Sequence, residues 1–212
     1  MRIIEPSIEV LSDINGPEML KAIERAGRTC YKSEGGITGA SAPAFVKKLI
    51  ENGHEAMLEH APSISIRFIC DRGVSHEIVR HRLFSFAQES TRYCNYGRNR
   101  FNNELTFIKP CFWGEDSPAY KAWYSAMETA ERAYLELLNV HGAKPEQARD
   151  VLPISVKTEL VVTGNAREWR HFLKLRADRA AHPQMRQCAN MALNILCENI
   201  EVLFDDIYKY SR

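Results

Sequence analysis

This sequence of 212 residues has little of what would place it in several common classes of protein. It lacks a basic excess, because 28 Lys and Arg residues against 27 Asp and Glu residues leave a net charge of +1, whereas general nucleic-acid binders are usually strongly basic. Its first residues lack the apolar core of a signal peptide, and its apolar runs are far shorter than a membrane span. We therefore expect a cytoplasmic protein with neither nucleic acid nor membrane as a partner.

Several chemical signatures are also missing. The six cysteines, at positions 30, 70, 94, 111, 188 and 197, include no Cys-x-x-Cys pair, so we expect buried, reduced thiols and neither a zinc site nor a disulfide framework. The segments that begin at His54 and His76 lack the second histidine, four positions on, of a zinc-protease helix. No Gly-x-Ser-x-Gly elbow, P-loop or dinucleotide fingerprint is present. The sequence predicts no metal site, no Rossmann domain and no serine hydrolase.

The composition, with 45% hydrophobic and 26% charged residues, is that of an ordinary globular protein. No linker or repeat divides the chain, so we expect one domain over residues 1–212. Residues 1–10 resemble an edge strand broken by Pro6, and strand patterns follow at residues 63–70 and 154–163. Helices are predicted at residues 17–31, 41–53, 73–81, 117–142, 145–152, 165–175 and 184–208. Residues 83–100 show no clean period. Helices and strands do not alternate regularly, which favours an α+β fold.

A basic cluster is the main candidate for chemistry. Arginine forks and hydroxyl groups together can hold phosphate oxygens. A surface network of salt bridges with Glu77 and Glu89 explains the same spacing equally well. The cluster consists of Arg80, His81, Arg82, Ser90 and Arg92.

A second cluster follows about seventy residues later, comprising Arg149, Asn165, Arg167, His171 and Arg176. Arg167 and His171 are four residues apart and share a helix face. Arg176 would reach the same region only if that helix ends near it. Asn165 fits equally well as a helix cap with Glu168 as its partner, and Arg149 as a cation at a helix carboxyl end.

The first cluster has the form Arg-His-Arg-x7-Ser-x-Arg, and this signature resembles that of flavin-dependent thymidylate synthases. Similar segments flank it at residues 53–60, 149–153, 165–167 and 172–178, so the likeness extends over roughly residues 20–205. Five fixed positions at fixed spacing make the signature specific.

The resemblance implies that the protein converts dUMP to dTMP. The carbon donor would be 5,10-methylenetetrahydrofolate, and NADPH would supply reducing equivalents through FAD. It also implies the family's own fold, with a mixed or antiparallel sheet, flanking helices and long helices at an oligomer interface. The expected assembly is a homotetramer with shared active sites.

The resemblance also implies roles for individual residues. Ser90, Arg92 and Arg149 would hold the phosphate of dUMP, with Arg149 from a neighbouring chain, and Arg176 would be catalytic, polarising the uracil and helping to ionise its N3. The implied dUMP positions are Glu77, Arg80, Gln88, Ser90, Arg92, Arg149 and Arg176. The implied FAD positions are His54, Glu59, Arg80, His81, Arg82, Gln88, Asn165, Arg167 and His171.

The sequence departs from the family's pattern at four places. Ala56 stands where some members have a hydroxyl residue, and His171 replaces an Asn. Ala87 and Gln88 replace an Asn-Glu pair, and Glu77 stands where others carry Gln. These changes put in doubt the details of cofactor affinity.

Two other functions remain possible from the residues alone. The same arginines, with Phe84, Phe86, Tyr93 and Tyr96, would suit a non-catalytic module that binds nucleotides or single-stranded RNA. A phosphoryl-transfer enzyme is disfavoured, since neither a Gly-rich phosphate loop nor a pair of carboxylates for Mg²⁺ is evident.

Overall fold

A computed structural model describes residues 1–211, including all side chains except those of residues 100, 210 and 211. The fold is α+β, as the sequence predicts. The strands are β1 (Arg2–Ile4), β2 (Ser7–Val10), β3 (Ile64–Asp71), β4 (Ser85–Gln88), β5 (Thr106–Ile108) and β6 (Lys157–Gly164). The helices are α1 (Gly16–Thr29), α2 (Ala42–Glu51), α3 (Arg72–Ile78), α4 (Pro118–Asn139), α5 (Pro145–Ala148), α6 (Ala166–Arg176) and α7 (Pro183–Ser211). Short 3-10 helices cover Glu34–Gly36, Glu55–His60, Asn99–Phe101 and Arg149–Val151.

The strands form two sheets, one pairing β1 with β5 in parallel and the other in the order β2-β3-β6-β4. The two long strands, β3 and β6, are neighbours and alternate between buried and half-buried residues, as period-two patterning predicts. Pro6 separates β1 from β2, which join different sheets, so the predicted break at this residue is confirmed.

Two strands have no counterpart in the predictions. Strand β4 falls inside residues 83–100, and of its four residues only Phe86 is even half-buried. Strand β5 has three residues. Such short strands carry little periodicity of their own, because pairing with a neighbouring strand is what orders them.

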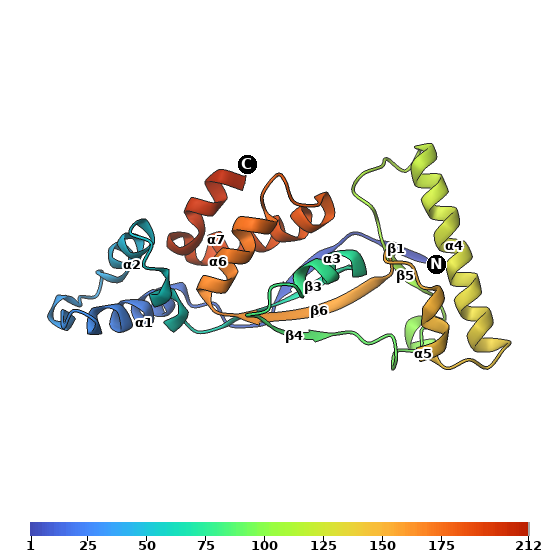
Figure 1. Ribbon diagram of the computed structural model, residues 1–212, viewed down its shortest axis with the longest axis horizontal. Coiled ribbons are helices and arrows are strands. Elements are labelled where there is room, and N and C mark those ends of the chain that lie inside the picture. Colours follow the sequence, from blue (N-terminus) through green and yellow to red (C-terminus); the bar gives the residue numbers. More distant parts are fainter. Residues whose placement is uncertain (212) are drawn as a thin grey trace. The chain divides into compact units, whose positions relative to one another are not determined.

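The chain divides into two compact units. Unit 1 comprises Met1–Ser7, Phe68–Arg80 and Ala87–Leu160. Its core joins the start of the chain to α4, which lies beside α5, β1 and β5 at the green and yellow end of the ribbon (Figure 1). Ser117 caps α4 as predicted, since its hydroxyl accepts a hydrogen bond from the Tyr120 amide at 3.1 Å. The buried core residues of this cluster are Tyr96, Leu105, Phe107, Met127, Tyr134, Ala148 and Val156.

Unit 2 comprises Ile8–Arg67, His81–Phe86 and Val161–Arg212. Its core lies between α6 and α7, with α1 packed against α2 (Figure 1). Trp169 is fully buried and donates from its indole nitrogen to the Ile64 carbonyl at 3.1 Å, which ties α6 to the first residue of β3. Helix α7 extends the predicted segment and contains one non-helical residue, Ile200. The single domain over residues 1–212 stays a prediction.

A fully buried guanidinium anchors α6 within unit 2. Arg170 donates to both carboxylate oxygens of Asp206 at 2.7 Å and also to the Leu203 carbonyl, both on α7. It also reaches Glu55 Oε1, at 3.1 Å from Nη2, in the 3-10 helix Glu55–His60. Glu55 is shared with Lys174 at 2.8 Å. These contacts hold the pKa of both acids below its usual range, against the opposing effect of burial.

All six cysteines are free thiols, but the expectation that they are buried is wrong for two of them. Cys70 and Cys188 are buried, whereas Cys30 and Cys111 are exposed, because they lie just after α1 and in the loop that leads to α4. Within residues 1–211, no helix combines the length and the hydrophobicity that crossing a membrane requires.

Replacing Arg170 with Met should lower the free energy of unfolding by about 3 kcal/mol, because two acids lose their buried partner. Urea unfolding measures the change. Lys209→Ala is the control, because it removes an exposed i,i+4 pair with Asp205 and should cost no more than about 0.5 kcal/mol. Equal effects of the two variants would contradict the anchoring role of Arg170.

Candidate functional site

The predicted site residues are divided between the two units. The segment from Arg80 to Arg92 enters both, because residues 81–86 belong to unit 2 and those on either side to unit 1. Unit 2 holds His54, Glu59, His81, Arg82, Asn165, Arg167, His171 and Arg176. Unit 1 holds Glu77, Arg80, Gln88, Ser90, Arg92 and Arg149.

In unit 2, the start of α6 is fixed by local sequence. Asn165 Oδ1 accepts from the Glu168 amide at 3.0 Å and Glu168 Oε2 accepts from the Asn165 amide at 2.9 Å, which confirms the predicted capping box. At Gly164, a Cβ atom would lie 2.2 Å from the Phe84 ring, so only glycine fits there. Phe84 in turn packs on Trp169, with ring centroids 4.8 Å apart. The segment His81–Phe86 is therefore held against α6.

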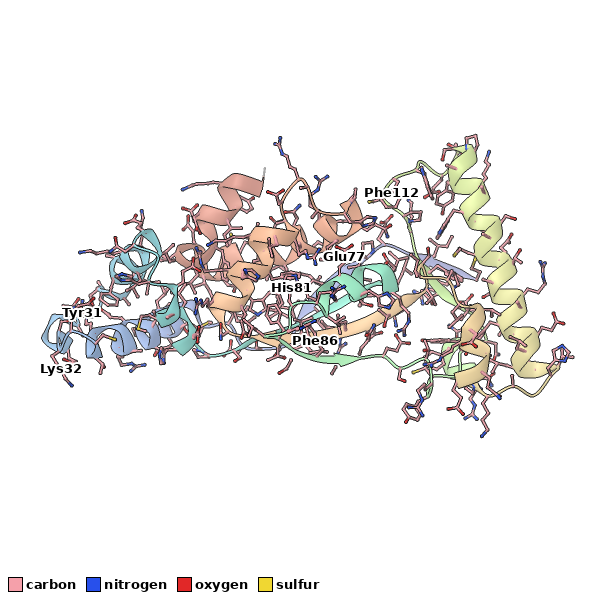
Figure 2. All side chains as sticks on the ribbon, viewed as in Figure 1. Tyr31, Lys32, Glu77, His81, Phe86 and Phe112 are labelled. Carbon is pink, nitrogen blue, oxygen red and sulfur yellow. The ribbon has the colours of Figure 1, made fainter. Side chains whose placement is uncertain are left out.

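His81 and Arg176 meet directly. Arg176 is the last residue of α6, and its Nε donates to His81 Nε2 at 3.0 Å. The His81 ring lies 5.0 Å from the Phe172 ring and 5.9 Å from the His171 ring, beside α6 (Figure 2). Burial, with smaller contributions from the charges of Arg176 and His171, lowers the His81 pKa to about 4. His81 is therefore neutral near pH 7, with Nε2 as an acceptor and the proton on Nδ1.

Glu59 and Arg167 also come together. Arg167 Nη1 lies 2.5 Å from Glu59 Oε1, and both side chains are about half exposed, at 48% and 46%. Ion pairs at such exposure contribute little to stability, so an anionic ligand can compete for Arg167 at low cost. His171, one turn further along α6, is exposed as well.

His54 lines a cavity of about 770 Å³ within unit 2, a volume in the usual range for ligand sites. The walls include the apolar side chains of Phe45, Leu49 and Met57, and Lys48 adds an exposed cation. Apolar walls suit a planar ring system, and cations suit a diphosphate. The residues present therefore fit a cofactor such as FAD. Ala56, Arg28 and Tyr31 also line this cavity, and Tyr31 is labelled in Figure 2.

In unit 1, Arg92 is an exposed arginine whose ionic contact is long. Its guanidinium lies 3.9 Å from Glu146 Oε2, beyond the usual hydrogen-bond distance, and stacks 5.3 Å from the Tyr93 ring centroid. The Ser90 hydroxyl accepts from the Arg92 amide at 3.2 Å, which shapes the turn between them. Arg149 is exposed at the start of the 3-10 helix Arg149–Val151.

A salt-bridge network through Glu89 does not account for the basic cluster. Glu89 Oε1 accepts from the Tyr96 hydroxyl at 2.8 Å, and its Oε2 pairs with Lys157 at 3.1 Å. Its carboxylate is therefore committed within unit 1 to side chains other than those of the cluster's arginines. Tyr96 is buried, and burial beside Glu89 raises its pKa.

Gln88 makes contacts that the sequence does not predict. Its Nε2 donates to Ser75 Oγ at 2.9 Å and to Thr158 Oγ1 at 3.2 Å, and both hydroxyl residues are fully buried. The one available signal was Thr158, a polar residue in phase with Leu160 and Val162 on the buried face of β6. Among the residues implied for flavin, Arg80 and Arg82 are both exposed.

The protein resembles known proteins over nearly its whole length. The family model described as "Thymidylate synthase complementing protein" matches residues 9–200. The flavin-dependent thymidylate synthase of Corynebacterium aurimucosum is 36% identical, with 92% of this chain and 83% of the relative covered. That of Mycolicibacterium gilvum is 35% identical, with 95% and 84% covered. The chain belongs to this family.

A solved structure confirms the family fold. The UMP/dUMP methylase PolB from Streptomyces cacaoi, crystallised with 5-Br dUMP, matches with a TM-score of 0.81. The alignment covers 100% of this chain and 98% of that one at 24% identity. The family model and the two relatives confirm the recognition, from the Arg-His-Arg signature, of a member of the flavin-dependent thymidylate synthase family.

The residues at which this thymidylate synthase family member departs from the family's pattern lie in both units. Ala56 lines the cavity together with His54, while His171 contacts His81. Gln88 is held by two buried hydroxyls, and Glu77 lies half-buried on α3. The residue roles implied by the resemblance stay predictions.

His81 should remain neutral down to about pH 4 in the folded protein, where an ordinary histidine has a pKa of 6.5. Since the unfolded chain takes up this proton at higher pH, the neutral ring's contribution to stability is full above pH 6.5. It is lost as the pH falls from there towards 4. An NMR titration of the imidazole protons measures the pKa. Arg176→Met should raise it only part of the way, because burial is the larger cause, and a wild-type midpoint near 6.5 would contradict this account.

Proposed function

We propose that this protein is a flavin-dependent thymidylate synthase that methylates dUMP to dTMP, with FAD as its cofactor. The observation that carries the proposal is the family match over residues 9–200, which contains the whole signature from Arg80 to Arg92. We further propose 5,10-methylenetetrahydrofolate as the carbon donor, NADPH as the reductant and the cytoplasm as the location. When bound, FAD would supply hydride chemistry, which leaves binding, orientation and electrostatics to the protein.

The phosphate of dUMP is proposed to lie against Ser90, Arg92 and Arg149. Two guanidinium groups and a hydroxyl suit a phosphate dianion through charge-assisted hydrogen bonds. Arg92 supports this assignment, because its ionic partner Glu146 stands at 3.9 Å and leaves the guanidinium able to take a closer anion. Glu77, Arg80 and Gln88 are proposed to complete the nucleotide site.

Arg176 is proposed to be the catalytic residue. It would polarise a uracil carbonyl and help to ionise N3, because a fixed cation favours negative charge that develops beside it. Its hydrogen bond to neutral His81 supports this role by fixing the direction of the guanidinium. No side chain in this arrangement has to act as a covalent nucleophile.

The flavin is proposed to be held by the residues that the resemblance implies. In unit 2 these are His54, Glu59, His81, Arg82, Asn165, Arg167 and His171, and in unit 1 they are Arg80 and Gln88. We also propose a homotetramer with active sites shared between chains, for which sedimentation should show a species of four chains. A stable monomer in solution would contradict the shared sites.

The test of the function is direct. Purified protein, reconstituted with FAD, should be yellow and should form dTMP from dUMP when methylenetetrahydrofolate and NADPH are supplied. UMP, which differs only by its 2′-hydroxyl, is assayed alongside to define the sugar preference. A colourless protein that takes up no FAD and forms no dTMP, but retains single-stranded RNA, would favour a binding module instead.

Arg92→Ala should weaken dUMP binding about 10- to 100-fold, because a charge-assisted hydrogen bond contributes about 1.5–3 kcal/mol. Isothermal titration calorimetry of the FAD-loaded protein measures the dissociation constant. Arg98→Ala, which removes an exposed arginine six residues further on, is the matched control. If both variants bind dUMP like the wild type, Arg92 is a surface residue and its role is misassigned.

A further inference from the structure

The carboxamide of Gln88 is held from one side by two hydroxyl groups buried within unit 1. Gln88 Nε2 donates to Ser75 Oγ at 2.9 Å, on α3, and to Thr158 Oγ1 at 3.2 Å, on β6. Both hydroxyl residues are 0% exposed, whereas Gln88 as a whole is exposed. Buried hydroxyls require hydrogen-bond partners, so these contacts are costly to break.

The backbone keeps Gln88 in register with these hydroxyls. Gln88 is the last residue of β4, and β4 is the neighbour of β6 in the sheet. The pairing continues past the strand, because the Glu89 amide donates to the Glu159 carbonyl at 2.9 Å. Thr158, the residue before Glu159, lies on the buried face of β6. The side chain of Gln88 is thus fixed at both its backbone and its amide nitrogen.

Ser75 determines which end of the amide turns inward. Its hydroxyl donates to the Arg72 carbonyl at 3.0 Å, one turn back in α3, so its proton is already used. Ser75 Oγ can therefore only accept from Gln88, which requires the NH₂ group on that side. Among the backbone groups and side chains that the structure describes, none donates a hydrogen bond to Gln88 Oε1. The exposed side chain therefore offers an uncharged acceptor.

We propose that Ser75 is a positioning residue for nucleotide binding: it orients Gln88 so that Oε1 accepts a hydrogen bond from the bound uridine nucleotide. This inference rests on the proposed function, which places Gln88 in the nucleotide site. The matching donors on the ligand are a sugar hydroxyl and the N3–H of uracil. In this chain Gln88 replaces the Glu of the family's pattern. A Glu carboxylate can only accept hydrogen bonds, so it would need both hydroxyls to donate. The direction of hydrogen bonding is therefore reversed here.

Two variants separate positioning from stability. Ser75→Ala removes the hydroxyl that fixes the orientation of the Gln88 amide. The amide can then turn over and accept from the Thr158 hydroxyl, and its NH₂ group would face the donor on the ligand. Thr158→Val removes a hydroxyl that is equally buried but leaves Ser75 in control. Ser75→Ala should weaken dUMP binding about tenfold and Thr158→Val by no more than about twofold, since a mismatched donor pair loses one hydrogen bond and leaves a group unsatisfied.

The measurement is calorimetric titration of FAD-loaded wild type and both variants, after thermal unfolding has shown that each is folded. Three ligands are compared: dUMP, 2′,3′-dideoxy-UMP and N3-methyl-dUMP. The effect of Ser75→Ala should vanish for the ligand that lacks the donor, which also identifies that donor. A variant that fails to fold is replaced by Ser75→Cys, whose weaker acceptor should give a smaller loss in the same direction.

Other outcomes decide against the inference. Equal losses for Ser75→Ala and Thr158→Val, or equal losses across all three ligands, would make Ser75 a merely structural residue and overturn the proposal. Unchanged dUMP affinity in Ser75→Ala would do the same. A wild type that binds no dUMP would instead overturn the proposed function, so the two failures are distinguishable.

Discussion

The hydrogen bond from Arg176 to His81 requires a neutral imidazole that accepts through Nε2, and the proposed site depends on this neutral ring. The signature segment brings two further arginines next to His81 in sequence, and a protonated imidazole would add another positive charge. Burial against Phe172 and the nearby Arg176 keep the ring neutral, so Nε2 accepts and the guanidinium is oriented. The positive charge of this segment is then carried by its arginines, which stay protonated at all ordinary pH values, and this favours the proposed binding of an anion.

The position of α6 makes this contact possible. Its first turn is closed by the capping box, its middle is fixed by Trp169 and the buried Arg170, and its last residue is Arg176. Arg170 also contacts Glu55, which precedes Glu59 in the same 3-10 helix, while Arg167 pairs with Glu59. The buried ion pair therefore holds in register two segments whose exposed side chains are proposed to contact the flavin. Removing one member of such a pair is costly, because it leaves a buried charge without its partner.

The sequence predicts those features whose cause is local. The capping box at Asn165, the Ser117 cap and the break at Pro6 each follow from a few neighbouring residues, and all are observed. The sequence allowed a helix end near Arg176 without requiring one, and the structure shows that α6 ends at this residue.

Features that depend on tertiary pairing could not be predicted in the same way. Strand β4 is ordered by its neighbour β6, and the partners of Gln88 lie 13 and 70 residues away. The Glu59–Arg167 pair spans 108 residues. No spacing rule reaches across such distances, although the resemblance to the family singled out both members of that pair. Thr158, a polar residue on an apolar strand face, was the one local sign of the network around Gln88.

We propose above that the nucleotide phosphate is bound by Ser90, Arg92 and Arg149, and that the flavin is bound mainly by residues around α6. A crystal structure of the protein with FAD and dUMP tests this most directly. We expect the phosphate within hydrogen-bond distance of Arg92 and Ser90, and the uracil beside Arg176. A nucleotide bound away from Arg92, or a flavin that touches neither Arg167 nor His54, would contradict it.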